Sequence, residues 1–127
     1  MRLRNIPGAK DAITESPYVV QNPAEHKGSW NEVFPKDQPL HIEVGMGKGR
    51  FLMDMAKLHP ETNYVGIEMY DSVLLRALQK RERLEETGEK LANLKFMCVD
   101  ARLLPEIFEK GEVQKIYLNF SDPWPKA

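Results

Sequence analysis

The sequence predicts an α/β fold in which helices cover both faces of a parallel sheet. From residue 40 onward, segments with strand character alternate with segments that have the apolar spacing of amphipathic helices. The first strand segment runs directly into a glycine-rich turn, Gly45–Gly49. Strands that alternate with helices form right-handed crossovers, and such crossovers make neighbouring strands parallel. We therefore expect four strands in one parallel sheet.

The composition is that of an ordinary globular chain. Hydrophobic residues make up 42% and charged residues 29% of the 127 residues, enough for one domain with one core. The net charge of −1 gives no support to bulk electrostatic binding of nucleic acid. The single cysteine, Cys98, cannot form an internal disulfide and fits a reducing compartment. No apolar run is long enough to span a membrane, and no signal-peptide core follows Arg2 and Arg4, so a cytoplasmic location is the default expectation.

Residues 1–39 are predicted to form an extended, partly ordered N-terminal arm. They carry five of the nine prolines and show neither a helical nor a strand period. A short turn is expected near Trp30 to Phe34, and we place the boundary of the domain between residues 39 and 40. The basic residues near the start of the arm could contact phosphate, although a solvated terminus is the simpler interpretation.

The elements that follow are predicted from their apolar periods and their stop signals. Residues 40–44 alternate as a strand, and residues 50–58 place apolar side chains at helical spacing. Asp71 or Ser72 can cap a long helix that runs to about Thr87, and its mixed-charge run from Lys80 to Glu86 is expected to face solvent. The other predicted strands span residues 63–69, 94–99 and 115–120. The long helix spans residues 71–87, and a last, short helix spans residues 103–110.

An acidic residue stands at the end of each predicted strand. These residues are Glu43, Glu68, Asp100 and Asp122. In an open parallel sheet, ligands bind beyond the carboxyl ends of the strands. A single acid at such a place usually caps the next helix, but four in succession predict one acidic crevice.

The glycine spacing narrows the choice of ligand. A dinucleotide site needs G-x-G-x-x-G, whereas the spacing here is G-x-G-x-G. Glu43, two residues before Gly45, would repel a pyrophosphate and favour an ammonium or sulfonium group. Glu68, nineteen residues beyond Gly49, lies where an acid can accept both ribose hydroxyls. S-adenosylmethionine therefore fits better than NAD, and Asp100 would then meet the adenine amino group.

This pattern, E-x-G-x-G-x-G with an acid ending the second strand, resembles the class I S-adenosylmethionine-dependent methyltransferases. The resemblance implies a Rossmann-like fold with strand order 3-2-1-4. The last stretch, Leu118 to Lys126, resembles the Asp/Asn-Pro-Pro-aromatic motif that holds a nucleobase in base-amino methyltransferases. Asp122 could then accept hydrogen bonds from a base while Trp124 offers a stacking plane. The alternative is that Asp122 forms a turn and Trp124 is a core wedge.

Three segments of the chain resemble motifs of the bacterial tRNA (guanine-N7)-methyltransferase family. They are Ser-Asp-Pro-Trp-Pro-Lys near the end and, upstream of it, Glu-Val-Gly-Met-Gly-Lys-Gly and Lys-Gly-Ser-Trp. The resemblance implies formation of N7-methylguanosine at position 46 in the variable loop of tRNA, with Asp122 as the catalytic residue. Substrate-binding residues would be Trp124 and Lys126. Cofactor-binding residues would be Glu43, Gly45, Gly47, Gly49, Glu68, Asp100 and Asp122.

The chain departs from that family in length. Members continue past the last motif, whereas this chain stops at Ala127. The resemblance therefore implies the N-terminal part of the enzyme, with an incomplete sheet and residues 40–127 as a partial cofactor-binding domain. The fourth strand would be an unpaired edge along which two copies could pair.

Two other function classes stay open. One is a non-catalytic fragment that binds S-adenosylmethionine or RNA, and the other, disfavoured by the glycine spacing, is a nicotinamide-dependent oxidoreductase. His26, His41 and His59 lack metal-ligand spacing, so no metal is expected. Cys98 is expected to be an inert thiol inside a buried strand. Met46, Met53, Met55 and Met69 are expected to serve packing, with Met46 and Met69 flanking the crevice.

Overall fold

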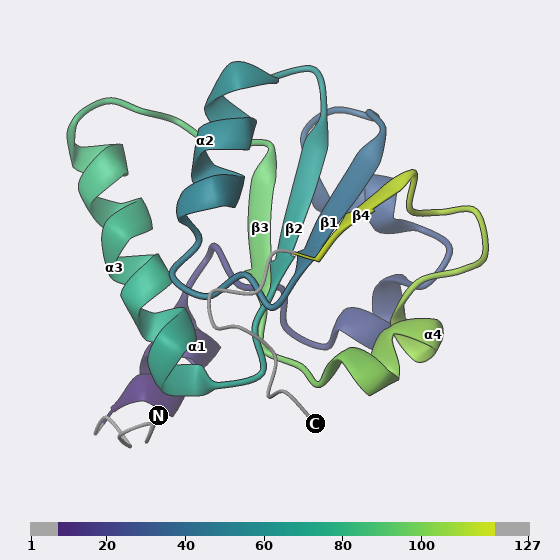
Figure 1. Ribbon diagram of the computed structural model, residues 1–127, viewed down its shortest axis with the longest axis horizontal. Coiled ribbons are helices and arrows are strands. Elements are labelled where there is room, and N and C mark those ends of the chain that lie inside the picture. The colour runs from purple at the N-terminus through teal and green to yellow at the C-terminus, as the bar shows by residue number, and fades with distance from the viewer. Residues whose placement is uncertain (1–7, 119–127) are drawn as a thin grey trace, which may run out of the picture.

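A computed structural model describes residues 8–118 of the chain. Within this range four parallel strands form one sheet in the order β3-β2-β1-β4, which confirms the predicted fold and strand order (Figure 1). The strands are β1 Leu40–Val44, β2 Asn63–Ile67, β3 Leu94–Met97 and β4 Lys115–Tyr117. The α-helices are α1 Ala9–Glu15, α2 Arg50–Leu58, α3 Asp71–Glu86 and α4 Leu104–Ile107, and the 3-10 helices are η1 Pro23–His26, η2 Trp30–Val33 and η3 Ala101–Leu103.

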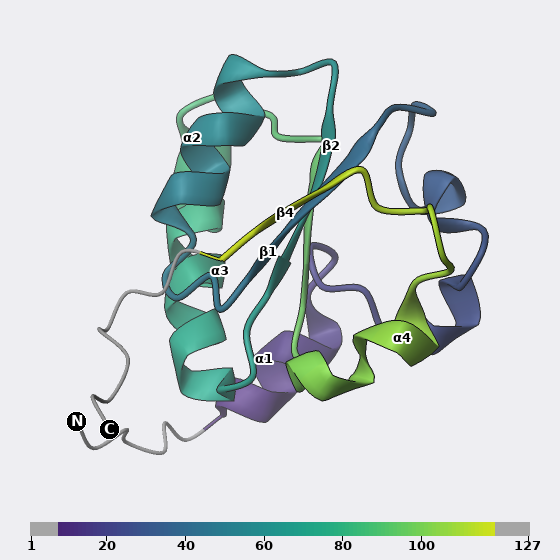
Figure 2. The ribbon, with the colours of Figure 1, turned by 45° about the vertical axis from the view of Figure 1, so that its right-hand side comes forward.

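Helices cover both faces of this sheet (Figure 2). Helices α2 and α3 lie on one face, and α4 lies on the other face with the short 3-10 helices. Every residue of β2 is buried, as expected for a central strand that contacts helices on both sides. Leu52, Leu78 and Phe96 belong to the core under α2 and α3, whereas Trp30 and Ile42 belong to the core under α4.

The predicted elements agree with the observed ones best near the glycine turn. β1 and α2 have the predicted bounds, whereas β2 and β3 each end two residues earlier than expected. Both strands therefore end before the acids that follow them, Glu68 and Asp100. The N-cap of α3 is Tyr70, and neither Asp71 nor Ser72 caps it.

The extended N-terminal arm was the least accurate prediction, because much of this segment is folded onto the sheet. Residues 9–15 form α1, which packs against α3 and buries Ala9 and Ile13. The backbone then pairs with β3: Val20 N donates to Phe96 O and Phe96 N donates to Tyr18 O, both at 2.8 Å. The short turn expected near Trp30 is present as η2. The boundary between residues 39 and 40 stays a prediction, although side chains from both sides share one core.

One residue of the run expected to face solvent is buried instead. Arg81 is only 3% exposed. Its guanidinium donates to Glu85 Oε2 at 2.5 Å and to Leu91 O at 3.2 Å, and it lies 4.4 Å from the centre of the Tyr18 ring. The N-terminal segment that carries Tyr18 covers this part of α3, which the charge pattern of the helix could not indicate.

Candidate functional site

The glycine turn joins β1 to α2 through three residues in the left-handed region. The φ angles are 73° at Gly45, 60° at Gly47 and 79° at Gly49, a conformation that residues with a β-carbon avoid. Gly49 is the N-cap of α2 and provides no side-chain cap. The N-terminus of α2 therefore begins on a turn whose backbone a ligand can approach closely.

This turn is attached to the carboxyl end of β2 by backbone hydrogen bonds. Gly45 N and Met46 N both donate to Ile67 O, at 2.9 and 3.0 Å. Gly47 N donates to Glu68 Oε1 at 3.0 Å. The structure thus brings together two features that the sequence separates by about twenty residues, the glycine turn and the acid that follows the second strand.

Glu68 connects the turn to the start of α3 as well. Its second carboxylate oxygen, Oε2, accepts from Tyr70 N at 3.1 Å, and the residue is 7% exposed. Each carboxylate oxygen has two lone pairs, so each can accept a further hydrogen bond beyond the one it receives from the backbone. Glu68 can therefore hold the turn and still accept hydroxyl groups from a ligand.

Glu43 lies beside the turn, near the end of β1. It is 1% exposed and pairs in register with Gly66 of β2 and Tyr117 of β4. Side chains alternate along a strand, and Ile42 belongs to the core under α4, so Glu43 points to the face covered by α2. A carboxylate buried this deeply is costly, and such groups concentrate at functional sites.

Asp100 stands at the rim of the same edge, after β3. Its Oδ1 accepts from Arg102 N at 2.9 Å and so caps η3, and its Oδ2 accepts from Arg102 Nη2 at 2.7 Å. The hydrogen bond from the Arg102 side chain, followed by that from the Arg102 backbone, lowers the pKa of the Asp100 carboxyl. The carboxylate is therefore charged at neutral pH and already has a cationic partner. Its contact with an adenine amino group stays a prediction.

Cys98 was expected inside a strand but follows the end of β3 and is only partly buried. Its Sγ donates to Met69 O at 3.6 Å, at the ends of the second and third strands. Burial raises the pKa of this thiol, and the charges of Asp71 and Glu68 raise it further. The group is therefore a neutral thiol at the acidic edge, partly buried against the core under α2 and α3.

Two large apolar residues follow Glu68 at this edge: Met69, which the sequence predicts to flank the crevice, and Tyr70, which sequence reasoning missed. Met69 and Tyr70, directly after Glu68, are 48% and 47% exposed. Large apolar side chains that follow a strand-end acid are a signal that could have been used, because a loop that carries them offers a surface for a flat apolar ligand. The other predicted site residues, Asp122, Trp124 and Lys126, lie outside the described residues.

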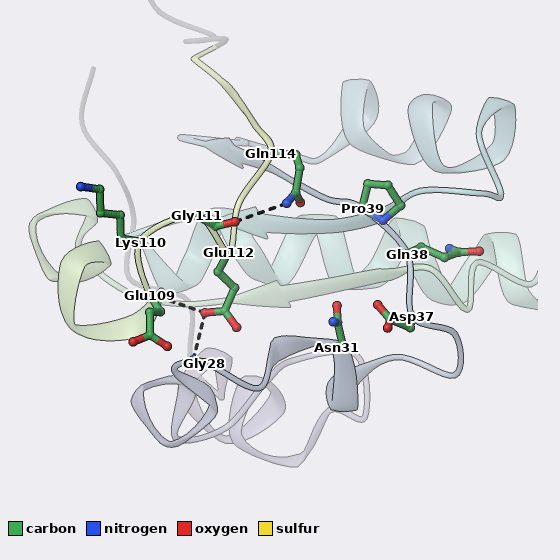
Figure 3. Close-up of a pocket in the computed structure, with 10 residues that line it drawn as sticks. All are labelled: Gly28, Asn31, Asp37, Gln38, Pro39, Glu109, Lys110, Gly111, Glu112 and Gln114. Atoms are coloured by element: carbon green, nitrogen blue, oxygen red, sulfur yellow. Dashed lines mark hydrogen bonds between the residues drawn. The ribbon is translucent and has the colours of Figure 1, made fainter.

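A separate cavity of about 590 Å³ lies at the opposite end of the sheet, next to the residues that precede β1 and β4 (Figure 3). Its central side chain, Glu112, accepts from Gly28 N at 3.0 Å, Glu109 N at 2.9 Å and Trp30 N at 3.0 Å. Burial alone would raise the pKa of Glu112, but these three N–H groups lower it. The carboxylate is thus used to hold the segment before β1. Among residues 8–118, no cluster of His, Cys, Asp or Glu could hold a metal ion.

Comparison of the sequence with known proteins shows which family this chain is similar to. A family described as "Putative methyltransferase" matches residues 37–127. A tRNA (guanine-N(7)-)-methyltransferase of Lachnoclostridium phytofermentans is 54% identical over 126 residues, which are 99% of this chain and 56% of that protein. The protein of the same name from Geobacillus kaustophilus is 55% identical over 127 residues, with the same coverage. The chain thus spans just over half the length of these relatives.

Solved structures support the same fold. The antibiotic-resistance methyltransferase Kmr has a TM-score of 0.53 and 27% identity, and the match covers 65% of this chain and 42% of that protein. An antibiotic-related methyltransferase has a TM-score of 0.63 and 23% identity, over 87% of this chain and 52% of that one. None of the helices within residues 8–118 has the length and apolar character needed to cross a membrane.

Proposed function

This chain belongs to the methyltransferase family that matches residues 37–127, and we propose that it is the S-adenosylmethionine-binding part of a tRNA (guanine-N7)-methyltransferase. The observation that carries the proposal is the direct contact between the glycine turn and Glu68, with Glu43 buried beside them. The names of the similar proteins support the reaction.

The residues present fit S-adenosylmethionine. Its sulfonium and ammonium groups are cationic and its ribose offers two hydroxyls, which suits a turn without β-carbons flanked by two acids. Glu68 would accept the ribose hydroxyls, Glu43 would face the cationic end, and Asp100 would accept from the adenine amino group. A pyrophosphate would meet the same two carboxylates as repulsive neighbours, which disfavours NAD. Gly45, Gly47 and Gly49 would allow the close approach.

The substrate half of the proposal depends on residues 122–126 and on the relatives. When bound, S-adenosylmethionine supplies an electrophilic methyl group. Guanine N7 carries a lone pair and no proton, so no strong general base is required and the protein contributes mainly by positioning. Asp122 would accept hydrogen bonds from the guanine edge, Trp124 would stack on the base, and Lys126 would contact the RNA. With tRNA as the substrate, the protein acts in the cytoplasm.

Binding and transfer assays test the two halves separately. Calorimetry should show that the chain binds S-adenosylmethionine and not NADH; the reverse result would favour the oxidoreductase. Transfer of a labelled methyl group is then measured on unmodified tRNA and on a transcript with adenosine at position 46, with the Geobacillus kaustophilus relative as the positive control. Methylation of the first transcript alone supports the proposal, and binding without transfer would support a non-catalytic fragment.

The role of Asp122 is tested in the same assays. Asp122→Ala should abolish methyl transfer while the dissociation constant for S-adenosylmethionine changes by only about two- to threefold, because the acid orients the base. Loss of cofactor binding together with activity would show that Asp122 belongs chiefly to the cofactor site.

A further inference from the structure

Gly66, in the middle of β2, is a glycine for reasons of space and not of conformation. It is absent from the glycines with positive φ, so its backbone is one that other residues adopt. A β-carbon added there would lie 2.2 Å from Met46 Sδ and 2.9 Å from Leu52 Cδ2. A glycine inside a strand weakens it and often marks a close approach by another group. Here the approaching group is the thioether of Met46.

Met46 reaches this notch from the glycine turn. It stands between Gly45 and Gly47 and is 5% exposed, whereas Lys48, the other side chain of the turn, is exposed. Because the glycines have no side chains, Met46 is the residue through which the turn packs into the core. The backbone N–H of Met46 donates to Ile67 O of β2, the strand that also contains Gly66. The backbone and the side chain of Met46 thus both hold the turn against β2.

We propose that Met46 is a positioning residue for the cofactor, and that the notch at Gly66 exists to seat it. The proposal rests on the proposed function of the turn as a cofactor site. Three glycines within five residues lose much conformational entropy when the turn is ordered. A turn that is already held in place by Met46 leaves less of that cost to ligand binding, which is the ordinary gain from preorganisation.

Two variants of the 127-residue chain test this, with a matched control. Met46→Ala removes the side chain from the notch, and Gly66→Ala fills the notch so that Met46 must leave it. Met97→Ala is the control, because the Met97 side chain is fully buried in the core under α4, on the other face of the sheet from Met46, and the substitution keeps the backbone through which Met97 O accepts from Glu68 N. Amide hydrogen exchange of Gly45 and Gly47 is measured without ligand, and calorimetry measures the dissociation constant for S-adenosylmethionine at a temperature where every variant is folded.

We expect both turn variants to speed exchange at Gly45 and Gly47 and to weaken binding of S-adenosylmethionine by about tenfold or more. Met97→Ala should lower the melting temperature but change both readouts by less than about twofold. The double variant Met46→Ala/Gly66→Ala removes the thioether at 2.2 Å but leaves Leu52 Cδ2 at 2.9 Å from the new β-carbon. It should therefore regain part of the melting temperature lost in Gly66→Ala without regaining affinity. Conservative replacement by Met46→Leu should retain most of the affinity.

Several outcomes would overturn the proposal. The proposal fails if Met46→Ala changes the exchange rates of the turn amides and the affinity for S-adenosylmethionine no more than Met97→Ala does. Another such outcome is a double variant that regains affinity in step with its melting temperature, since that would make Met46 a packing residue only. If the unsubstituted chain bound no S-adenosylmethionine, the proposed function would fail, yet the exchange rates of the free protein would still decide whether Met46 holds the turn.

Discussion

Replacement of Glu68 by glutamine tests the contact on which the site is built. The substitution keeps the size of the side chain but exchanges one acceptor oxygen for an NH2 group, which cannot accept. Glu68 now accepts one N–H from Gly47 at 3.0 Å and one from Tyr70 at 3.1 Å, so one of these two donors must lose its partner. Because the residue is only 7% exposed, water can replace the lost acceptor only poorly.

The magnitude follows from the cost of an unsatisfied donor. A buried donor without a partner costs about 1–3 kcal/mol, so Glu68→Gln should lower the free energy of unfolding by about that amount. If the same carboxylate accepts the ribose hydroxyls, loss of its charge should weaken S-adenosylmethionine binding by about ten- to a hundredfold. Urea denaturation gives the first quantity, and calorimetry gives the second.

The matched control is Glu61→Gln, the same chemical change at an exposed site. Glu61 has a side chain that is 67% exposed and contacts His59, so its substitution should leave the free energy of unfolding nearly unchanged. If Glu68→Gln behaved like Glu61→Gln in both measurements, the reasoning that places Glu68 at the centre of the site would be refuted.

The remaining predictions concern contacts elsewhere in the fold that stabilise it. Glu112→Gln should lower the free energy of unfolding by about 0.5–1.5 kcal/mol at pH 7, because it weakens hydrogen bonds to three N–H groups, two of which water can reach. Since those N–H groups lower the pKa of Glu112, the wild-type advantage should be complete above the ordinary value of 4.5 and should vanish as the pH falls through the lower folded-state pKa; a difference independent of pH in urea titrations would contradict this. A double-mutant cycle of Arg81→Ala and Tyr18→Ala should give a coupling of about 0.5–2 kcal/mol, and a coupling near zero would mean that the 4.4 Å contact contributes nothing.

Much of the architecture follows from local patterns in the sequence. The bounds of β1 and α2 could be predicted because a strand period, a glycine turn and a helical period follow one another without interruption. The parallel sheet follows from the alternation of elements, and its strand order is the one that the resemblance implies. The matching family and the relatives confirm that resemblance, which is drawn from the glycine turn and the final motif. Turn chemistry and periodicity depend on residues a few positions apart, which the sequence displays directly. The roles of Asp122, Trp124 and Lys126 stay predictions.

Tertiary structure alone decided how the turn is held. The periods that predict α2 say nothing of Met46 in the notch at Gly66, because that fit depends on where two separate segments meet. The burial of Arg81 likewise requires the N-terminal segment to fold over α3, and prolines obscured the short helix in that segment. Glu68 could be predicted to face a ligand from its place after the second strand. Its hydrogen bond to Gly47 is a long-range contact, and such contacts depend on the packing of the whole chain.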